Sequence, residues 1–313
     1  MTTFAFPSPS ALSRRTMVGV AALAAVVCLW SSFALSTRAL ETTGMSMGDA
    51  AIMRFGVPAI ALAPWIPRTM RHLRGEHASV IALVVLAGLP HFLLFAWGAH
   101  LTSAALTGLL VPGTVPLFVT VLLFLAFRSP IPRRRLVALG AIVAGVAVSA
   151  TLTGGPAGEG GIAVLMAAGL VWAAYTIGLS RTRLDPLGVI ALVSLTSLIA
   201  ALVLAAAGAL PSQLFSGTVD VPAWGAYALV QGVGTGMLST ACYVVAVKNL
   251  GGSITAAAGA LSPVLTAVVA VPLLDEPLTV GLALALVLIV SGVVAFALTP
   301  AGAARLPAAD RRR

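Results

Sequence analysis

The chain has 313 residues, of which 59% are hydrophobic and only 9% charged, and its mean hydropathy is +1.07. Soluble domains carry about 25% charged residues, so this composition excludes a water-soluble domain and predicts an integral membrane protein. A formal charge of +9 would favour nucleic-acid binding in a soluble protein. Here the basic residues lie in short loops, where they set membrane orientation, so we expect a lipid bilayer and no nucleic acid as partner.

Ten apolar segments follow one another, each about as long as the roughly 20 residues that cross a bilayer as a helix. Residues 1–13 are predicted to be a disordered cytoplasmic lead. Arg14-Arg15 then precedes a run to about residue 35, which we interpret as an uncleaved first span because nine comparable runs follow. The other predicted spans are 48–66, 78–98, 103–127, 136–153, 161–179, 187–209, 223–246, 252–273 and 278–298, followed by a basic tail over 300–313.

The basic residues predict the topology. If the N-terminus is cytoplasmic, all of the 18 Lys and Arg residues except Arg38 and Arg54 fall on the cytoplasmic side, and Asp275-Glu276 falls outside. This bias agrees with the positive-inside rule across ten alternations. We therefore expect a multi-pass protein of the inner or plasma membrane with both termini in the cytoplasm.

An internal repeat links the two halves. A shift of 147 residues places Pro116 on Pro263, Pro130 on Pro277 and Gly145-Val146 on Gly292-Val293; a shift of 142 places Trp30 on Trp172. Each half has five spans, an odd number, so the second copy must lie inverted in the membrane. The predicted fold is all-α, with ten transmembrane helices as two inverted five-helix repeats over 14–153 and 159–299. Inverted repeats are typical of transporters that alternate between inward-open and outward-open states.

The repeated Pro-x₁₃-Pro and Gly-Val pattern resembles the drug/metabolite transporter superfamily, in its EamA-type branch. Ser253–Pro263, Leu274–Pro277 and Gly292-Val293 carry the resemblance in the second half. Thr102–Pro116, Gly145-Val146, Met53-Arg54-Phe55 and the Trp172–Tyr175 stretch carry the rest. One departure is Arg128-Ser129, where the family has an acidic residue. The resemblance implies a metabolite exporter and covers about residues 15–300.

Two titratable residues are expected inside spans. Arg54 is interpreted as a carboxylate or phosphate clamp on the substrate path or, equally, as an arginine whose head group reaches the membrane surface. His91 follows Pro90 in the third span. A proton relay is one interpretation of it; a neutral imidazole bonded to a carbonyl freed by the proline is the favoured one.

Span eight carries a polar stripe at a spacing of four, Gln231, Thr235 and Ser239, with Tyr243 close to the same face. The stripe predicts either the lining of a cavity or hydrogen bonds between helices, and the neighbouring glycines favour close packing. Ser262 continues the pattern in span nine, where it shares a face with Thr255 and Thr266.

Prolines and aromatic residues complete the candidate site. Pro112 and Pro116, near Thr114, are expected to break the backbone hydrogen-bond ladder of span four twice and to form hinges or walls of the site. Pro116 and Pro263 are the predicted hinges; a simple kink is the alternative. Trp30 with Ser32, and Trp172 with Tyr175, are predicted to hold an amphipathic substrate. The alternative is a place in the aromatic belt of the membrane interface.

Several chemistries lack their motifs. The sequence has no H-E-x-x-H, no Walker A motif and no Cys/His metal spacing, and no Asp or Glu is expected within a span. We therefore predict no enzyme activity, no catalytic residues, no metal and no cofactor.

The favoured function is a secondary transporter that exports a small polar metabolite, such as an amino acid, through a central cavity between the repeats. One alternative is an exporter of cationic drugs or lipid-linked precursors; another is a membrane scaffold without flux. The sequence does not distinguish a monomer from a homodimer.

Overall fold

A computed structural model describes residues 14–40, 44–128, 130–152, 156–214 and 221–299. The disordered lead and the basic tail expected at 1–13 and 300–313 lie outside these residues. The helices are α1 (Arg14–Arg38), α3 (Met47–Ala61), η1 (Ala63–Trp65), α4 (Ile66–Leu73), α5 (Ala78–Val85), α6 (Leu89–Leu101), α7 (Ala104–Phe127), α8 (Arg133–Leu152), α9 (Pro156–Leu179), α10 (Pro186–Ala206), α11 (Val221–Tyr227), η2 (Ala228–Leu238), α12 (Ser239–Leu250), α13 (Gly252–Gly259), α14 (Ser262–Leu274) and α15 (Val280–Leu298).

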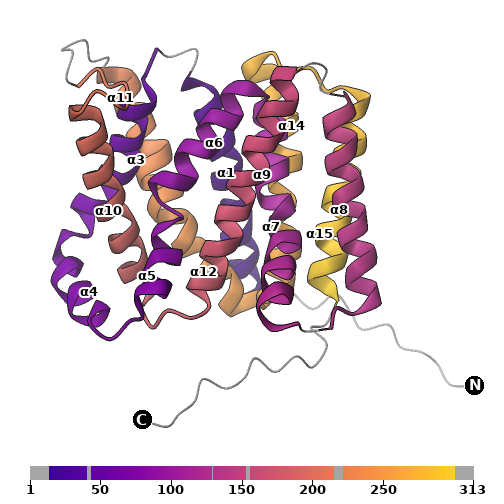
Figure 1. Cartoon of the computed structure of the whole chain (residues 1–313), viewed down its shortest axis with the longest axis horizontal. Coiled ribbons are helices and arrows are strands. Elements are labelled where there is room, and N and C mark those ends of the chain that lie inside the picture. Colours follow the sequence, from indigo (N-terminus) through magenta and orange to yellow (C-terminus); the bar gives the residue numbers. More distant parts are fainter. Residues whose placement is uncertain (1–13, 41–43, 129, 153–155, 215–220, 300–313) are drawn as a thin grey trace, which may run out of the picture.

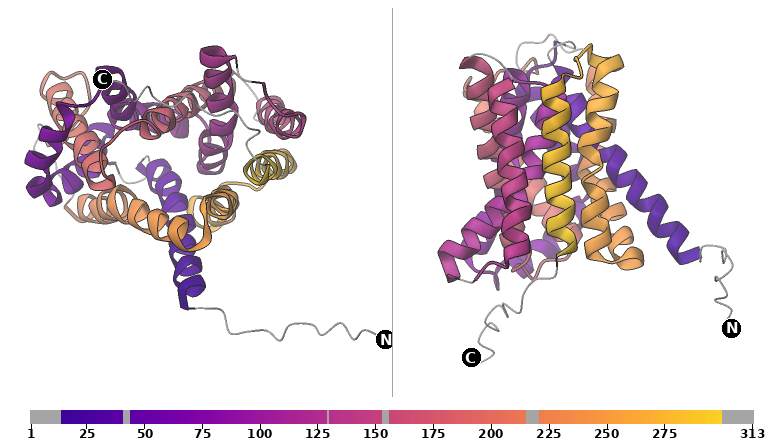
Figure 2. Two further views of the ribbon diagram at one scale, coloured as in Figure 1. Left: turned by 90° about the horizontal axis from the view of Figure 1, so that it is seen from below. Right: turned by 90° about the vertical axis from the view of Figure 1, so that its right-hand side faces the viewer.

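The helices form one bundle whose long elements run between two flat ends (Figure 1). Nine helical segments within the described residues are long and apolar enough to cross a membrane. The tenth crossing is α3 continued by η1 and α4 after a bend of 61°. Figure 2 shows that α1 begins and α15 ends at the same end of the bundle, as an even number of crossings requires. The predicted all-α fold is therefore confirmed.

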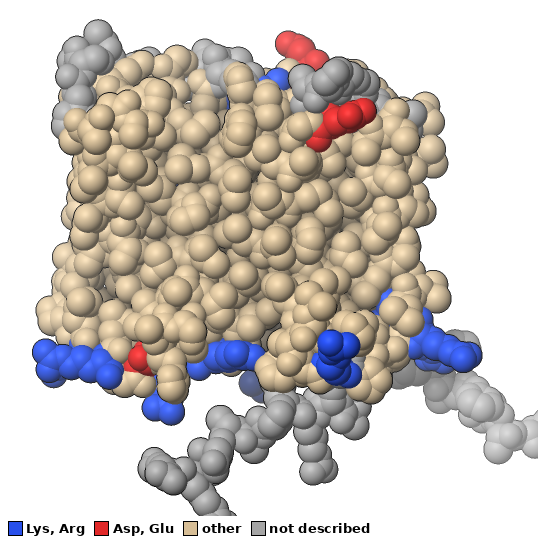
Figure 3. Space-filling model, viewed as in Figure 1, with Lys and Arg blue, Asp and Glu red and all other residues tan. Residues whose placement is uncertain are grey.

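Charge separates the two ends. Lys and Arg side chains line one end, and most of the visible Asp and Glu side chains lie at the other (Figure 3). The second span bends after Ala61, because prolines at 58, 64 and 67 remove backbone donors there. The short α4 carries Arg68 and Arg71 on its exposed side. Between the ends the outer surface is apolar, as Val137 (74% exposed) and Val280 (78% exposed) illustrate, which suits lipid contact.

The last helices of the two halves, α8 and α15, pack against each other with reciprocal contacts. A side chain at Gly145 would meet Ile289, and one at Gly292 would meet Ile142. Gly145 and Ile142 are each 147 residues before Gly292 and Ile289, so the contact is made twice with the roles of the halves exchanged. Such a self-complementary contact is the signature of a two-fold axis. The offset read from the sequence thus relates positions that are equivalent in space.

The other helices also pack in pairs in which the two halves exchange roles. The first helix of each half packs against the fourth span of the other half, as α1 against α14 and α9 against α7. The second helix of each half likewise packs against the third span of the other, as α3 against η2 and α10 against α5 and α6. Even the turns agree, because α7 and α14 both end at a left-handed residue, Arg128 and Asp275, each with φ of 52°. The halves are interlocked inverted repeats.

The fourth spans of the two halves treat their prolines differently. In the first half α7 continues as one helix through Pro112 and Pro116, so the two prolines remove backbone donors without dividing the span. Close packing supports α7 there: Gly108 admits Thr266 of α14, and Gly113 admits Ile289 of α15. In the second half the helix is interrupted, because α13 ends at Gly259 and α14 begins at Ser262 with Pro263 in its first turn. The hinge roles of Pro116 and Pro263 stay predictions.

One acidic residue corrects the sequence analysis, which expected none within a span. Asp49 lies in the first turn of α3 and is fully buried. Its carboxylate accepts hydrogen bonds from the hydroxyls of Ser46 and Ser212 and from the backbone N–H of Gln213. These donors compensate the charge near a helix N-terminus, where a carboxylate is favourable. Asp49 therefore connects the segment after α10 to α3 through hydrogen bonds.

Candidate functional site

Arg54 extends from the middle of α3 toward η2. Its Nη1 donates hydrogen bonds to Gln231 Oε1 and, at 3.0 Å, to Thr235 Oγ1. Both acceptors are neutral and buried, and the two residues come from the polar stripe of span eight. Of the two interpretations given to that stripe, the structure shows hydrogen bonds between helices. The Arg54 side chain does not extend to the membrane surface, because its guanidinium is bound inside the bundle.

The element that presents Gln231 and Thr235 is a π-helix of 11 residues, η2, and the rest of the stripe lies on α12. π-helices are rare, usually a single turn, and frequent at functional sites. Glycines let η2 come close to its neighbours: a side chain at Gly232 would lie 2.6 Å from Val57 Cβ, and one at Gly236 would lie 3.1 Å from Pro58 Cγ. The backbones of α3 and η2 are thereby held close enough for the Arg54 side chain to contact two successive stripe residues.

Three phenylalanine rings surround the Arg54 guanidinium. Its Cζ lies 4.2 Å from the centre of the Phe33 ring, 5.6 Å from Phe55 and 5.9 Å from Phe92. The faces of aromatic rings attract a cation, most strongly where water is excluded. Gln231 is held in turn from α1, because its Nε2 donates to the Phe33 carbonyl at 3.1 Å and to Ser36 Oγ at 2.6 Å.

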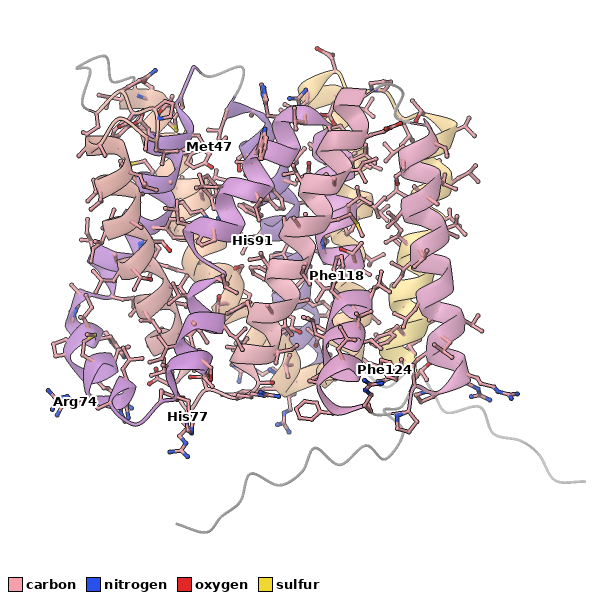
Figure 4. The ribbon with its side chains drawn as sticks, viewed as in Figure 1. Met47, Arg74, His77, His91, Phe118 and Phe124 are labelled. Atoms are coloured by element: carbon pink, nitrogen blue, oxygen red, sulfur yellow. The ribbon has the colours of Figure 1, made fainter. Side chains whose placement is uncertain are left out.

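His91 lies at mid-height in the bundle on α6 (Figure 4) and is 3% exposed. Its ring is 4.7 Å from that of Trp172 on α9, and Trp172 is 5.0 Å from Tyr175. The favoured sequence interpretation, a side-chain bond to a freed carbonyl, is not seen at Nε2, which has no hydrogen-bond partner. The gap between α5 and α6 is instead bridged by Ser197 of α10, whose Oγ accepts the N–H of Leu89 at 3.0 Å.

Trp30 is placed as the repeat predicts. It stacks on Tyr243 of α12 at 5.6 Å, so each tryptophan of the pair meets a ring from the third span of the other half. Trp30 also lines a recess of about 90 Å³, together with Pro112, Gly259 and Pro263. This recess is separate from Arg54, so the sequence-predicted residues divide into an Arg54 group, a His91–Trp172 group and a Trp30 group.

The remaining hydroxyl candidates are used locally. Ser32 donates to the Leu29 carbonyl of its own helix, and Thr114 donates to the Leu110 carbonyl at 2.7 Å. Ser262 is contacted from α1 by Ser31, which donates to its carbonyl at 2.9 Å. Ser31, rather than Ser32, therefore makes the contact between the halves.

Sequence reasoning missed the residues of α1 that complete the Arg54 group. They are Phe33, Ser36 and Thr37, of which Thr37 accepts from Gln231 Nε2 at 3.2 Å. The sequence does contain a pattern that could have identified them. Positions i, i+3 and i+4 share one face of a helix, and two of these three residues are polar within an apolar span.

The two halves that meet at Arg54 also match a known family twice. The EamA-like transporter family matches residues 17–151 and again residues 159–298. Together these segments include nearly all the described helices. The chain belongs to the EamA-like transporter family.

A comparison with solved structures supports the fold. A crystal structure described only as that of a protein is similar to this EamA-like chain, with a TM-score of 0.55 and 19% identity, over 91% of this chain and 98% of the other. At that identity the likeness supports the fold alone. No curated protein matches the chain.

The Arg54 group is made by both EamA-like repeats. Arg54 and Phe33 belong to the first matched segment, and Gln231 and Thr235 belong to the second. A group divided in this way changes whenever one repeat moves against the other. Among the described residues no three His, Cys, Asp or Glu side chains are grouped as a metal site would require.

Proposed function

We propose that this EamA-like protein is a secondary transporter that exports a small polar metabolite, such as an amino acid, by alternating access. It acts in the inner or plasma membrane with both termini in the cytoplasm. The observation that carries the proposal is the interlocking of two inverted halves around a buried polar group in which both halves take part. Transporters built from inverted repeats bind substrate near the bilayer midplane, beside interrupted helices.

Both third spans depart from regular α-helix near their middle. The first has a short break between α5 and α6, and the second changes to the π-helix η2 without a gap. Interrupted helices supply backbone groups and bending points where a substrate can be bound and released. The clustering of Lys and Arg at one end supports the cytoplasmic orientation of that end (Figure 3).

A fixed buried cation also bears on the alternatives. Arg54 favours an anionic or zwitterionic substrate and repels the cationic drugs of the main alternative. A scaffold without flux gives no reason for a charged side chain buried between the two halves.

The test is counterflow in proteoliposomes. The purified chain is reconstituted with an unlabelled amino-acid mixture inside, and uptake of each labelled amino acid is followed. We expect saturable uptake that requires the internal substrate, because exchange across a carrier needs a substrate on both sides. Liposomes without protein are the control. Exchange of organic cations alone would refute the amino-acid assignment, and no exchange of any compound would favour the scaffold.

A further inference from the structure

Arg54 has no counter-charge in the part of the chain that the structure describes. The ion pairs found there are Arg38 with Glu276 and Arg68 with Asp185, and neither includes Arg54. Asp49, the carboxylate of the same helix, is occupied by Ser46, Ser212 and Gln213. An unpaired charge inside a membrane protein is costly and marks a functional site by default. A ligand that supplies the opposite charge would offset the free-energy cost of burying the arginine.

The guanidinium also has an unused donor. Nη1 is taken by Gln231 and Thr235, but Nε is buried without a partner. Buried polar groups are nearly always hydrogen-bonded, so each exception requires an explanation. The geometry of guanidinium matches that of a carboxylate, which accepts from two of its N–H groups at once.

A second unpartnered polar atom lies in the same neighbourhood. His91 Nε2 is buried without a hydrogen bond, and His91 is close enough to Arg54 to interact with it electrostatically. Two aromatic rings join them: Phe33 lies against Arg54 at 4.2 Å, Phe33 stacks on Phe95 at 4.2 Å, and Phe95 is 5.7 Å from His91. Rings therefore occupy the space between a cationic end and a polar end. Opening of one half against the other would separate these rings and admit a ligand between them.

We infer that Arg54, Phe33 and His91 form the substrate site, that Arg54 binds a carboxylate, and that His91 Nε2 contacts a second polar group of the same molecule. This inference rests on the proposed transport function and names its substrate class: small organic carboxylates, amino acids included. One cation with no lysine beside it suits a singly charged carboxylate better than a doubly charged phosphate. The ring track Phe33–Phe95–His91–Trp172 binds the apolar part of the molecule.

Binding and flux are measured separately on the full chain. Quenching of tryptophan fluorescence in detergent reports binding, because Trp172 is 4.7 Å from His91; Trp172→Phe identifies the reporter. The probes are phenylalanine, alanine, phenethylamine, which lacks the carboxylate, and inorganic phosphate. We expect phenylalanine and alanine to bind, phenylalanine more tightly, and phenethylamine and phosphate to bind at least about tenfold more weakly.

Two variants of the cluster sharpen the test. Arg54→Gln should weaken the binding of carboxylates by at least about tenfold. Gln231→Glu places a carboxylate where Arg54 already binds an oxygen, so the arginine gains an internal counter-ion. The variant loses the donation from Nε2 to the Phe33 carbonyl, but the hydroxyls of Ser36 and Thr37 can turn to donate to the new carboxylate. We therefore expect it to fold, while the affinity for phenylalanine falls by about tenfold or more. Gln231→Glu keeps the test valid if Arg54→Gln fails to fold.

The control is Ser103→Ala, which removes a hydrogen bond to the N–H of Leu106 at the start of α7 and contacts none of Arg54, Phe33 and His91. It should leave phenylalanine affinity unchanged. Equal binding of phenylalanine by wild type and Gln231→Glu, or equal binding of phenethylamine and phenylalanine, would overturn the site. So would the absence of binding by every carboxylate at millimolar concentration. Counterflow unaffected by Gln231→Glu would refute this site but retain transport, whereas Arg54-dependent binding without any flux would refute transport and retain the site.

Discussion

Two equivalent interfaces of the bundle differ in chemistry. In one, α3 packs on η2 through Arg54 and its hydrogen bonds to Gln231 and Thr235. In the other, α10 packs on α5 through buried aliphatic side chains such as Val84 and Leu192, and one neutral serine bridges the helix gap. The fold is repeated, but the charge is present only once.

The difference separates what the architecture needs from what the substrate needs. The apolar α10–α5 interface shows that the helices can pack at this place without any charged group. Arg54 is therefore an addition to the scaffold, made at the cost of burying a cation beside neutral partners. Substitutions at the two interfaces should accordingly have opposite effects on stability and on binding.

The largest expected effect is that of a charge placed in the apolar interface. Leu192→Arg puts a cation among buried aliphatic residues, and an arginine at the centre of a membrane helix costs about 2.5–3.5 kcal/mol. Arg54→Leu should instead leave the thermal midpoint in detergent unchanged or raise it, since it removes an unpaired buried charge. Equal destabilisation by the two variants would show that Arg54 is a structural residue.

Glu276 lies in the turn after α14 and tests an electrostatic contact between the halves. Its carboxylate accepts the N–H of Ala104 at 2.8 Å at the start of α7 and pairs with Arg38 at 3.4 Å. Glu276→Ala should cost about 1.5–3 kcal/mol of stability, the range for hydrogen bonds to a charged group.

The control for Glu276 lies at the same helix end. Ser103 also caps α7, through the N–H of Leu106, and Ser103→Ala should cost about 1 kcal/mol. Denaturant titration in mixed micelles measures both losses. A smaller loss for Glu276→Ala than for Ser103→Ala would mean that the carboxylate adds nothing to the cap.

Two glycines offer matched steric changes. Gly232→Ala would place a methyl group 2.6 Å from Val57 Cβ at the Arg54 interface, and Gly178→Ala would place one 2.6 Å from Leu83 Cβ between α9 and α5. Each should cost about 1–3 kcal/mol through overpacking. Only Gly232→Ala should also weaken the binding of phenylalanine, because it displaces η2 and with it Gln231. Loss of binding in both variants would indicate a general loosening of the bundle.

The smallest effect concerns the paired left-handed residues. Arg128→Gly should stabilise the protein by about 0.5–1 kcal/mol, because glycine adopts positive φ without the steric cost that other residues have. Asp275→Gly should gain less, since aspartate tolerates this conformation better than arginine. Thermal midpoints of the two single variants provide the comparison, and an equal gain would contradict it.

The sequence by itself determined the architecture. Long apolar segments leave only membrane helices, because the bilayer satisfies no backbone group. The offset of 147 identified Gly145 and Gly292, each of which packs against an isoleucine of the other half. Arg54, Gln231 and Thr235 could also be singled out, since polar side chains are conspicuous in an apolar span.

Only the tertiary structure decided which of these residues meet. Arg54 and Gln231 are 177 positions apart, and no local pattern records a contact of that separation. Phe33 and Ser36 belong to the site through the path of α1, whereas Ser32, one position away, faces elsewhere. Helix continuity was also settled by packing: α7 passes through two prolines because its neighbours fit against its glycines, and η2 departs from the α-helix over a stretch without proline. Hydrophobicity and local spacing fix the spans, but side-chain partners depend on the orientation of packed helices, which is a property of the whole bundle.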